Sequence, residues 1–241
     1  MNVAGLRPLW PAPAGVHAFT SFRSGGVSEG EFAGLNLGGH VGDHPERVAE
    51  NRRRLTQCLR LPAEPLWLSQ VHGSRIVDGA APATLEADGA WTDQSAVVCA
   101  VMTADCLPIL LCDVSGRKIA AVHAGWRGLA EGVIEAAVAA LQPAELMAWL
   151  GPAIGPDAFE VGPEVRQAFT QRHGSYGEAF RPGTGDRWLA DIYMLARLVL
   201  EGRGIGRVYG GGLCTHSDSR CFFSHRRDGR TGRMATLIWR T

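Results

Sequence analysis

Three unbroken apolar runs, at 96–102, 108–112 and 119–122, place the centre of this sequence inside a hydrophobic core. Each run is far shorter than the eighteen or so apolar residues of a membrane-spanning helix, and shorter than most buried helices. Short runs that are apolar at every position match strands covered on both faces. The sequence therefore predicts a sheet buried inside a larger fold.

Helices accompany these strands, because apolar residues recur elsewhere at helical spacing. One helix is predicted over 45–60, with Asp43 as its cap and Pro45 in its first turn, and others at about 129–141 and 187–201. Further strands are predicted at 16–19, 66–72, 146–150, 207–211 and 235–239. Since strands and helices do not alternate strictly, we expect an α/β or α+β fold of packed mixed β-sheets flanked by helices, in one domain over 1–241.

The charge balance and the cysteine content argue against nucleic-acid-binding, membrane-bound and disulfide-rich secreted proteins. The chain has 24 basic and 24 acidic residues, so it lacks the basic excess typical of proteins that bind nucleic acid or membrane surfaces. The first fifteen residues do not resemble a signal peptide. Six cysteines are too sparse for a disulfide scaffold in a chain of 241 residues. We therefore expect a cytoplasmic protein with reduced thiols, no nucleic acid partner and no membrane association.

His72, Cys106 and His123 stand at or just after the ends of predicted strands. Side chains at strand ends can converge on one crevice, the usual position of a site in a sheet-based protein. Two imidazoles and a thiolate suit zinc, with copper as the alternative, and three protein ligands leave one tetrahedral position open for catalysis. The same residues also allow chemistry without a metal, with Cys106 as a nucleophile and His123 as its base.

Five further residues are candidates for the site. Asp88 and Asp105 lie in turns, and either could be a general base or a hydrogen-bond partner of a metal-bound histidine. Arg52 lies on the apolar stripe of its predicted helix, so its charge needs a carboxylate or a substrate anion such as phosphate. Arg23 and Asn36 lie in Gly-rich segments that could approach a substrate closely.

A second cluster of possible ligands, Cys214, His216, Cys221 and His225, matches no common structural zinc spacing, and the sequence has no C-x-x-C pair. We therefore expect one metal site in this chain.

Seven segments together resemble one family. They are FTSFRSGGVS (19–28), LNLG (35–38), QVHG (70–73), ADG (87–89), TADCLP (103–108), HAGWRG (123–128) and FFSHRRDG (222–229). Their order and spacing are similar to the bacterial YfiH/YlmD family, also called the multicopper polyphenol oxidase (laccase-like) or peptidoglycan editing factor family, with FAMIN as its mammalian relative. The resemblance covers nearly the whole chain.

The resemblance implies a monomeric domain of packed mixed sheets, with a fold shared with the catalytic domain of cytotoxic necrotising factor toxins. It implies zinc, sometimes copper, at His72, Cys106 and His123. The implied activities are phosphorolysis of adenosine, inosine and methylthioadenosine, adenosine deamination, polyphenol oxidation and editing of wrongly built muropeptide precursors. His216 and His225 stand where many bacterial members are expected to have Tyr, which bears on substrate preference.

Among these activities we favour purine nucleoside chemistry, with a nucleoside and phosphate as small-molecule partners. A multicopper oxidase needs several copper sites, whereas this sequence offers one convincing set of three ligands, and zinc has no redox chemistry. Polyphenol oxidation is then a side activity. The alternative enzyme is a hydrolase that uses Cys106 on an amide bond of a UDP-muropeptide precursor, and the alternative without catalysis is a purine sensor.

Overall fold

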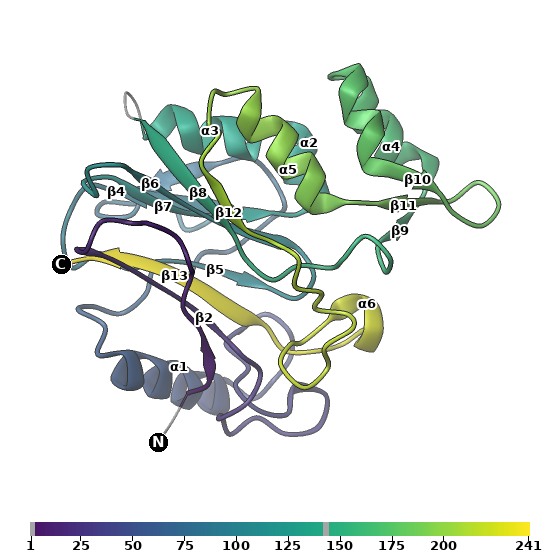
Figure 1. Ribbon diagram of the computed structural model, residues 1–241. Coiled ribbons are helices and arrows are strands. Elements are labelled where there is room, and N and C mark those ends of the chain that lie inside the picture. The colour runs from purple at the N-terminus through teal and green to yellow at the C-terminus, as the bar shows by residue number, and fades with distance from the viewer. Residues whose placement is uncertain (1–2, 142–144) are drawn as a thin grey trace.

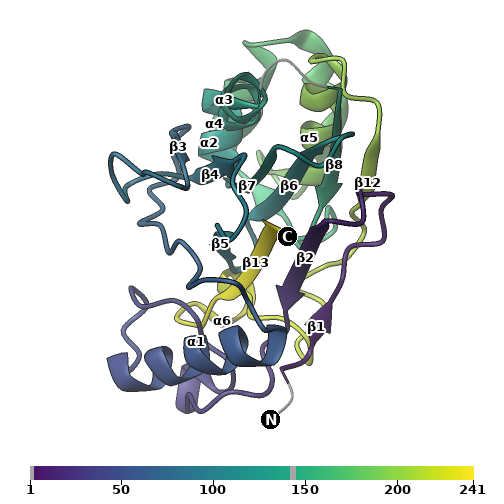
Figure 2. The same ribbon diagram turned by 90° about the vertical axis from the view of Figure 1, so that its left-hand side faces the viewer.

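The computed structural model describes residues 3–141 and 145–241, which form stacked layers of helices and sheets (Figure 1). A six-stranded sheet lies at the centre and is covered by helices on one face and by a four-stranded sheet on the other. A single long helix lies beyond the second sheet. Figure 2 shows the same layers from the side. The prediction of packed mixed sheets flanked by helices is confirmed.

The six-stranded sheet holds the most buried part of the chain. Its strands, in spatial order, are β12 (Val208–Gly210), β8 (Leu146–Leu150), β6 (Leu107–Asp113), β7 (Ile119–Ala124), β4 (Gly89–Thr92) and β3 (Ile76–Asp78). Every residue of β6 and β7 is buried, as the apolar runs predicted. The two strands pair antiparallel, whereas β12 pairs parallel with β8 and β3 pairs parallel with β4.

The four-stranded sheet pairs strands from the beginning, the middle and the end of the sequence. Its order is β1 (Gly5–Leu6), β2 (Val16–Ser21), β13 (Met234–Arg240) and β5 (Cys99–Thr103). The last strand, β13, pairs antiparallel with both β2 and β5, so residues near the C-terminus lie beside residues from the middle of the sequence. A small third sheet is formed by β10 (Phe180–Pro182), β11 (Trp188–Ala190) and β9 (Glu160–Val161).

The helices lie outside the two larger sheets. Those over the six-stranded sheet are α2 (Trp126–Glu131), α3 (Val133–Ala140) and α5 (Ile192–Glu201), whereas α4 (Pro163–Thr170) packs beside α2 and the small third sheet. Helix α1 (Pro45–Leu59) lies on the opposite side, and the short α6 (His225–Asp228) and 3-10 turns η1 (Gly30–Phe32) and η2 (Gly174–Ala179) complete the described elements. Among the described residues, no helix has the length and apolarity needed to cross a bilayer.

Three element predictions were wrong in part. The predicted helix over 187–201 is a strand followed by a helix, because Asp191 accepts a hydrogen bond from the Met194 amide and caps α5 at that point. The predicted helix near 129–141 is divided at Gly132, whose φ is 96°. The predicted strand at 96–102 begins only at Cys99.

The predicted strand at 66–72 is also wrong, and this error concerns the site. The segment makes two isolated bridges, Leu66 with Cys99 and Ser69 with Glu86, and otherwise runs as a loop. At His72 the backbone has a φ of 62°, in the left-handed region that interrupts a strand. His72 therefore reaches the site from a loop, and other residues must hold that loop in place.

Candidate metal centre

Cys106 and His123 are placed by the central sheet. His123 is the fifth residue of β7, and its Cα partner across the ladder is Pro108 near the start of β6. Cys106 precedes β6 in a tight turn in which Asp105 has a φ of 87°. The turn directs the Cys106 side chain back toward His123, so the thiol and the imidazole meet at one end of the sheet.

His72 is held in the same place by Asp88 and Gln70. The fully buried Asp88 carboxylate accepts hydrogen bonds from the backbone amides of His72 (2.9 Å) and Gly73 (2.7 Å). The Gln70 amide group both donates to the Met102 carbonyl (2.8 Å) and accepts from the Met102 amide (2.7 Å), which ties the loop to β5. These contacts replace the strand pairing that the loop lacks.

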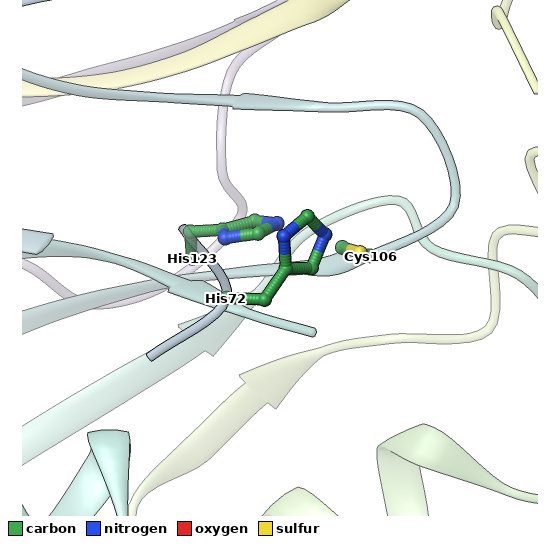
Figure 3. Close-up of side chains that lie close together, drawn as sticks. All are labelled: His72, Cys106 and His123. Atoms are coloured by element: carbon green, nitrogen blue, oxygen red, sulfur yellow. The ribbon is translucent and has the colours of Figure 1, made fainter. Parts of the chain in front are cut away.

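The three side chains point toward one another (Figure 3). One ligand atom from each of His72, Cys106 and His123 can be chosen so that all lie within 4.8 Å of one another. The two imidazole rings meet edge to face, with centroids 4.8 Å apart. Elsewhere in the described ranges no other group of three His, Cys, Asp or Glu side chains is close enough to hold a metal ion.

Asp88 also fixes which nitrogen of His123 faces Cys106. An ionised carboxylate can only accept, so the 2.9 Å contact means that His123 Nδ1 carries the hydrogen and donates to Asp88 Oδ1. The other nitrogen, Nε2, is then available to the thiol or to a metal ion. A carboxylate behind a histidine ligand is the usual way in which proteins orient the ring and raise its basicity.

The buried charges stabilise one another. Burial alone would raise the pKa of the Cys106 thiol, but the charge of His123 and hydrogen bonds from both histidines lower it to about 6. Burial alone would lower the pKa of His123, but the Cys106 thiolate and Asp88 raise it. The site therefore favours a thiolate, which is the form of cysteine that binds metals and attacks electrophiles.

The donor set fits a metal ion, and a glycine leaves space for it. A tetrahedral zinc ion with ligands at about 2.0–2.3 Å holds its donor atoms about 3.3–3.6 Å apart, so the donor atoms of this cluster, which lie within 4.8 Å of one another, would draw closer around it. Gly125, at the start of α2, lies against all three ligands. A Cβ atom there would be 2.9 Å from Cδ2 of His72 and 3.2 Å from Sγ of Cys106. Only a residue without a side chain leaves the ligands where they are.

Two cavities meet at Cys106. The first has a volume of about 180 Å³ and is lined by His40, Gln70, His72, Met102, Thr103, Ala104, Cys106, His123, His225 and Arg233. The second has a volume of about 140 Å³ and is lined by Ala104, Asp105, Cys106, Trp126, Ile154, Phe159, Ile192, His225 and Arg226. The first is rich in cationic and polar groups, whereas the second is mainly apolar, so the centre lies between two environments of opposite character.

Comparison with known proteins identifies the family. Residues 16–241 match the family described as multi-copper polyphenol oxidoreductase laccase. The chain belongs to this family. It is 54% identical to a Pseudomonas aeruginosa protein named purine nucleoside phosphorylase, over 98% of each chain. It is 50% identical to the Escherichia coli purine nucleoside phosphorylase YfiH, over 96% of this chain and 97% of that one.

Solved structures of similar proteins share the fold. A Neisseria meningitidis protein superposes with a TM-score of 0.95 at 49% identity, over 98% of each chain. YlmD from Geobacillus stearothermophilus superposes with a TM-score of 0.87 at 34% identity, over 98% of this chain and 96% of that one. The sequence-based assignment to the YfiH/YlmD family is thus confirmed.

In this laccase-family member, the carboxylates of Asp88 and Asp105 both accept hydrogen bonds from residues around the site. Asp88 contacts four donors, namely three backbone amides of the His72 loop and the His123 ring. Asp105 accepts from the Thr215 hydroxyl and from the Arg226 amide, both at 2.6 Å. With both oxygens of each carboxylate occupied, these contacts favour holding the site together over proton transfer.

Two of the predicted substrate-binding residues lie away from the centre. The Arg23 guanidinium donates to the Ser219 carbonyl at 3.2 Å and stacks over the Phe223 ring. The fully buried Asn36 side chain donates to Asp43 and accepts from the backbone amide of Arg233 at 3.0 Å. Neither residue lines the two cavities, and Asn36 reaches the centre only through Arg233.

Arg52 contacts a backbone carbonyl and an aromatic ring, and not the carboxylate that was one of its two predicted partners. Its guanidinium donates through Nε (3.0 Å) and Nη2 (2.8 Å) to the Leu37 carbonyl and stacks over Trp67, 4.1 Å from the ring centroid. In the described ranges no carboxylate lies within 4.0 Å of it. A carbonyl oxygen and an aromatic face thus take the place of the expected anion.

Several residues of the site were missed by the sequence analysis. His40, Thr103 and Arg233 line the cationic cavity, and Trp126 and Phe159 line the apolar one. Trp126 follows the predicted ligand His123 by three residues, which is a signal that could have indicated it. The two histidines at expected tyrosine positions differ: His225 lines both cavities, whereas His216 lies beside Cys214 in another hollow.

We expect Gly125→Ala to lose metal without loss of the fold. The φ of Gly125 is −66°, so alanine adds no backbone strain, but its methyl group displaces His72 or Cys106. Metal affinity should fall about 10- to 100-fold, the range seen when the surroundings of metal ligands are disturbed. Competition with a chelator measures this. The control is Gly206→Ala, where an added Cβ meets nothing within 4 Å. Equal affinities in the two variants would contradict the site.

Proposed function

We propose that this protein is a zinc-dependent purine nucleoside phosphorylase, with copper as the alternative ion. The observation that carries the proposal is that the three ligand side chains meet where an apolar cavity adjoins a cationic one. A nucleoside has an apolar, stackable base, and phosphate is an anion, so the two substrates match the two environments. The names of the similar proteins from Pseudomonas aeruginosa and Escherichia coli support the same activity.

Different residues of this chain would hold the metal ion and the purine base. His72, Cys106 and His123 would hold the ion, which supplies a Lewis acid able to stabilise negative charge. Trp126 and Phe159 offer aromatic faces to the purine base. In the reaction, a phosphate oxygen forms a bond to C1′ of the ribose and the bond from C1′ to the base nitrogen breaks. The bond pair leaves with the base, which takes up a proton, and ribose 1-phosphate remains.

Two further activities are proposed for the same centre. Adenosine deamination needs water at C6 of the purine, and the fourth position of a three-ligand site suits that chemistry. Polyphenol oxidation is supported by the family description. Since the described residues offer one group of three metal ligands, we infer that oxidation is a side activity of a single copper-loaded site.

One feature favours the alternative of a cysteine hydrolase. Cys106, His123 and Asp88 lie in a row, with the thiol hydrogen-bonded to the imidazole and the imidazole hydrogen-bonded to the carboxylate. The same order of nucleophile, base and orienting acid occurs in cysteine and serine hydrolases. In that mechanism Cys106 would attack an amide of a muropeptide precursor, and His72 would have no required role.

Analysis of products tests the proposal. Protein purified without added copper should hold about one zinc ion per chain, because one three-ligand site is present. With adenosine it should release adenine and ribose 1-phosphate only when phosphate is added, and inosine whether or not phosphate is added. Mass spectrometry distinguishes these products. Release of free ribose in place of ribose 1-phosphate would contradict phosphorolysis, and absence of any nucleoside product would favour the hydrolase.

A further inference from the structure

The cationic cavity contains no carboxylate, and the Cys106 thiol is the acidic group among its lining residues. Its ten lining residues include four histidines and one arginine, but no aspartate or glutamate. Burial lowers the pKa of His40, and the charges of Arg233, Arg52, His123 and His72 lower it further. Positive charge thus accumulates on this side of the metal centre, and a bound anion would relieve it.

Arg233 forms no ion pair with a described carboxylate, and the negative groups that act on it, Cys106 and Asp105, do so through charge alone. Its Nη1 donates to the backbone carbonyls of Thr231 (2.9 Å) and Gly232 (3.0 Å). Its Nε and Nη2 make no hydrogen bond to any described residue, and no described carboxylate lies within 4.0 Å of it. Burial is the largest influence on its pKa, which is lowered. A half-buried guanidinium with unused donors and no paired carboxylate destabilises the fold unless a ligand accepts its remaining hydrogen bonds.

Thr103 provides a second, independent indication. This residue ends β5, is 2% exposed and lines the same cavity. Its hydroxyl oxygen is buried and has no hydrogen-bond partner. Thr103 pairs in register with Met234, the residue after Arg233, and both Thr103 and Arg233 line this cavity. A buried hydroxyl without a partner costs stability, so its retention here points to a polar ligand.

The backbone of Arg233 is fixed, which makes it suited to binding. Its amide donates to Asn36 Oδ1 at 3.0 Å, and its carbonyl accepts from the Leu37 amide at 3.1 Å. The arginine is thus anchored before a ligand arrives, and little freedom is lost on binding. Asn36 therefore acts on the cavity as a positioning residue.

We propose that Arg233, together with the Thr103 hydroxyl, binds inorganic phosphate beside the metal centre. The unused Nε and Nη2 form the planar fork that binds two oxygens of a phosphate at once, and the hydroxyl donates to a third. This inference rests on the proposed function, because it names the residues that hold the second substrate. It moves that role from Arg52, whose corresponding fork already donates to the Leu37 carbonyl.

Phosphate affinity of the zinc-loaded protein tests the proposal. Calorimetric titration with inorganic phosphate alone gives the dissociation constant, and steady-state kinetics give the KM of each substrate. We expect Arg233→Gln to weaken phosphate binding about 10- to 100-fold, as for loss of hydrogen bonds to a charged group. The KM for nucleoside should change by less than about twofold. Arg233→Lys should recover only part of the affinity, because it keeps the charge and loses the fork.

Arg230→Gln is the matched control. Arg230 lies three residues earlier in the same loop and also donates to backbone carbonyls, those of Val41 and Gly42, but it lines neither cavity. Its loss should leave phosphate affinity unchanged. Thr103→Val, which keeps the shape of the side chain, should weaken phosphate binding about 3- to 10-fold, as for one neutral hydrogen bond, and serves as the deciding variant if Arg233→Gln folds poorly.

The outcomes separate this inference from the proposed function. Unchanged phosphate affinity in Arg233→Gln and Thr103→Val would overturn the inference, even if the protein cleaves nucleosides. Loss of phosphate affinity in Arg52→Gln but not in Arg233→Gln would return the role to Arg52. If phosphate binds through Arg233 while nucleosides stay intact, the phosphorylase function fails and the anion site stands.

Discussion

Asp88→Asn is expected to cost the protein both its metal and several kcal/mol of stability. The carboxylate is fully buried and accepts four hydrogen bonds: Oδ1 from the His72 amide and His123 Nδ1, and Oδ2 from the amides of Val71 and Gly73. An asparagine side chain has one acceptor oxygen, so its NH₂ group must face two donors. Stranded donors cost about 1–3 kcal/mol each, so two of them give a loss of roughly 2–6 kcal/mol.

The metal should be lost because Asp88 holds two of its ligands. Without the carboxylate, the His72 loop loses its anchor and the His123 ring loses the partner that fixes its tautomer. Loss of such a partner usually lowers metal affinity about 10- to 100-fold, and here one residue serves both histidines, so we expect the upper end of that range. The measurements are zinc affinity by chelator competition and unfolding in urea of the metal-free protein.

The stability effect should depend on pH in a defined direction. Burial alone would raise the pKa of Asp88, but its hydrogen bond and charge interaction with His123 and the loop amides hold it below the usual value. A group whose pKa is lower in the folded state stabilises the fold above its unfolded pKa of about 3.9, and this contribution is lost as the pH falls further. The difference in unfolding free energy between wild type and Asp88→Asn should therefore shrink below about pH 4.

Asp113→Asn is a suitable control. Asp113 is buried at the opposite end of β6 and accepts from the Ser115 hydroxyl and the Lys118 amide. Its replacement should destabilise the protein by about 1 kcal/mol and leave the zinc affinity unchanged. If Asp88→Asn bound zinc as the control does, Asp88 would be a structural residue with no part in the centre.

The sequence predicted well the parts of this fold that local pattern determines. The apolar runs at 108–112 and 119–122 became β6 and β7, and the capped, amphipathic segment after Asp43 became α1. Where pattern and local hydrogen bonding disagreed, the pattern failed. The helical spacing of Leu189 with the α5 residues suggested one continuous helix, yet Asp191 caps the start of α5, and the residues before it form β11, which pairs with β9 and β10.

The convergence of the three ligands was predicted from strand ends, and the structure brings them together by a different route. Only His123 lies in a strand. Cys106 depends on a turn, and His72 depends on two long-range hydrogen bonds: its own amide donates to Asp88, 16 positions away, and Gln70 donates to Met102, 32 positions away. The sequence contains no periodic signal for such long-range contacts, so the residues that hold the His72 loop could be suspected but not assigned.

The cationic cavity was not predictable for a related reason. Arg233 and Thr103 line one cavity because β13 pairs with β5, a pairing between segments about 130 positions apart. Arg52, in contrast, was conspicuous because it lies on an apolar helix stripe. The structure shows that a backbone carbonyl and an indole ring can together contact a half-buried guanidinium. An arginine on an apolar helix stripe therefore indicates that a partner exists, but not that the partner is an anion.

Cys106→Ser is expected to abolish most activity, and the manner of the loss separates the two leading functions. As a metal ligand, the thiolate holds the ion and never bonds to substrate. Serine offers a neutral hydroxyl in place of a soft thiolate, so zinc should bind weakly and activity should fall about 100-fold or more at one equivalent of zinc. Excess zinc should restore part of it, because His72 and His123 remain.

His72→Ala completes the test, since it affects only one of the two mechanisms. The row formed by Cys106, His123 and Asp88 stays intact in this variant, so a cysteine nucleophile should keep most of its activity. A metal centre should lose its ion and its activity. Cys221→Ser, a half-buried thiol outside both cavities, is the control and should behave as wild type.

The nucleophile mechanism makes the opposite set of predictions. It requires that Cys106→Ser leaves metal content unchanged, that zinc at any level fails to rescue it, and that a substrate fragment can be trapped on Cys106 by mass spectrometry. We expect no such adduct. The low pKa of the Cys106 thiol suits both roles, so reactivity toward alkylating agents does not distinguish them. The effect of zinc on alkylation does distinguish them: bound zinc should protect Cys106 from alkylation, and removal of zinc should make the thiol reactive. Alkylation at the same rate with and without zinc would place the thiol outside the metal centre.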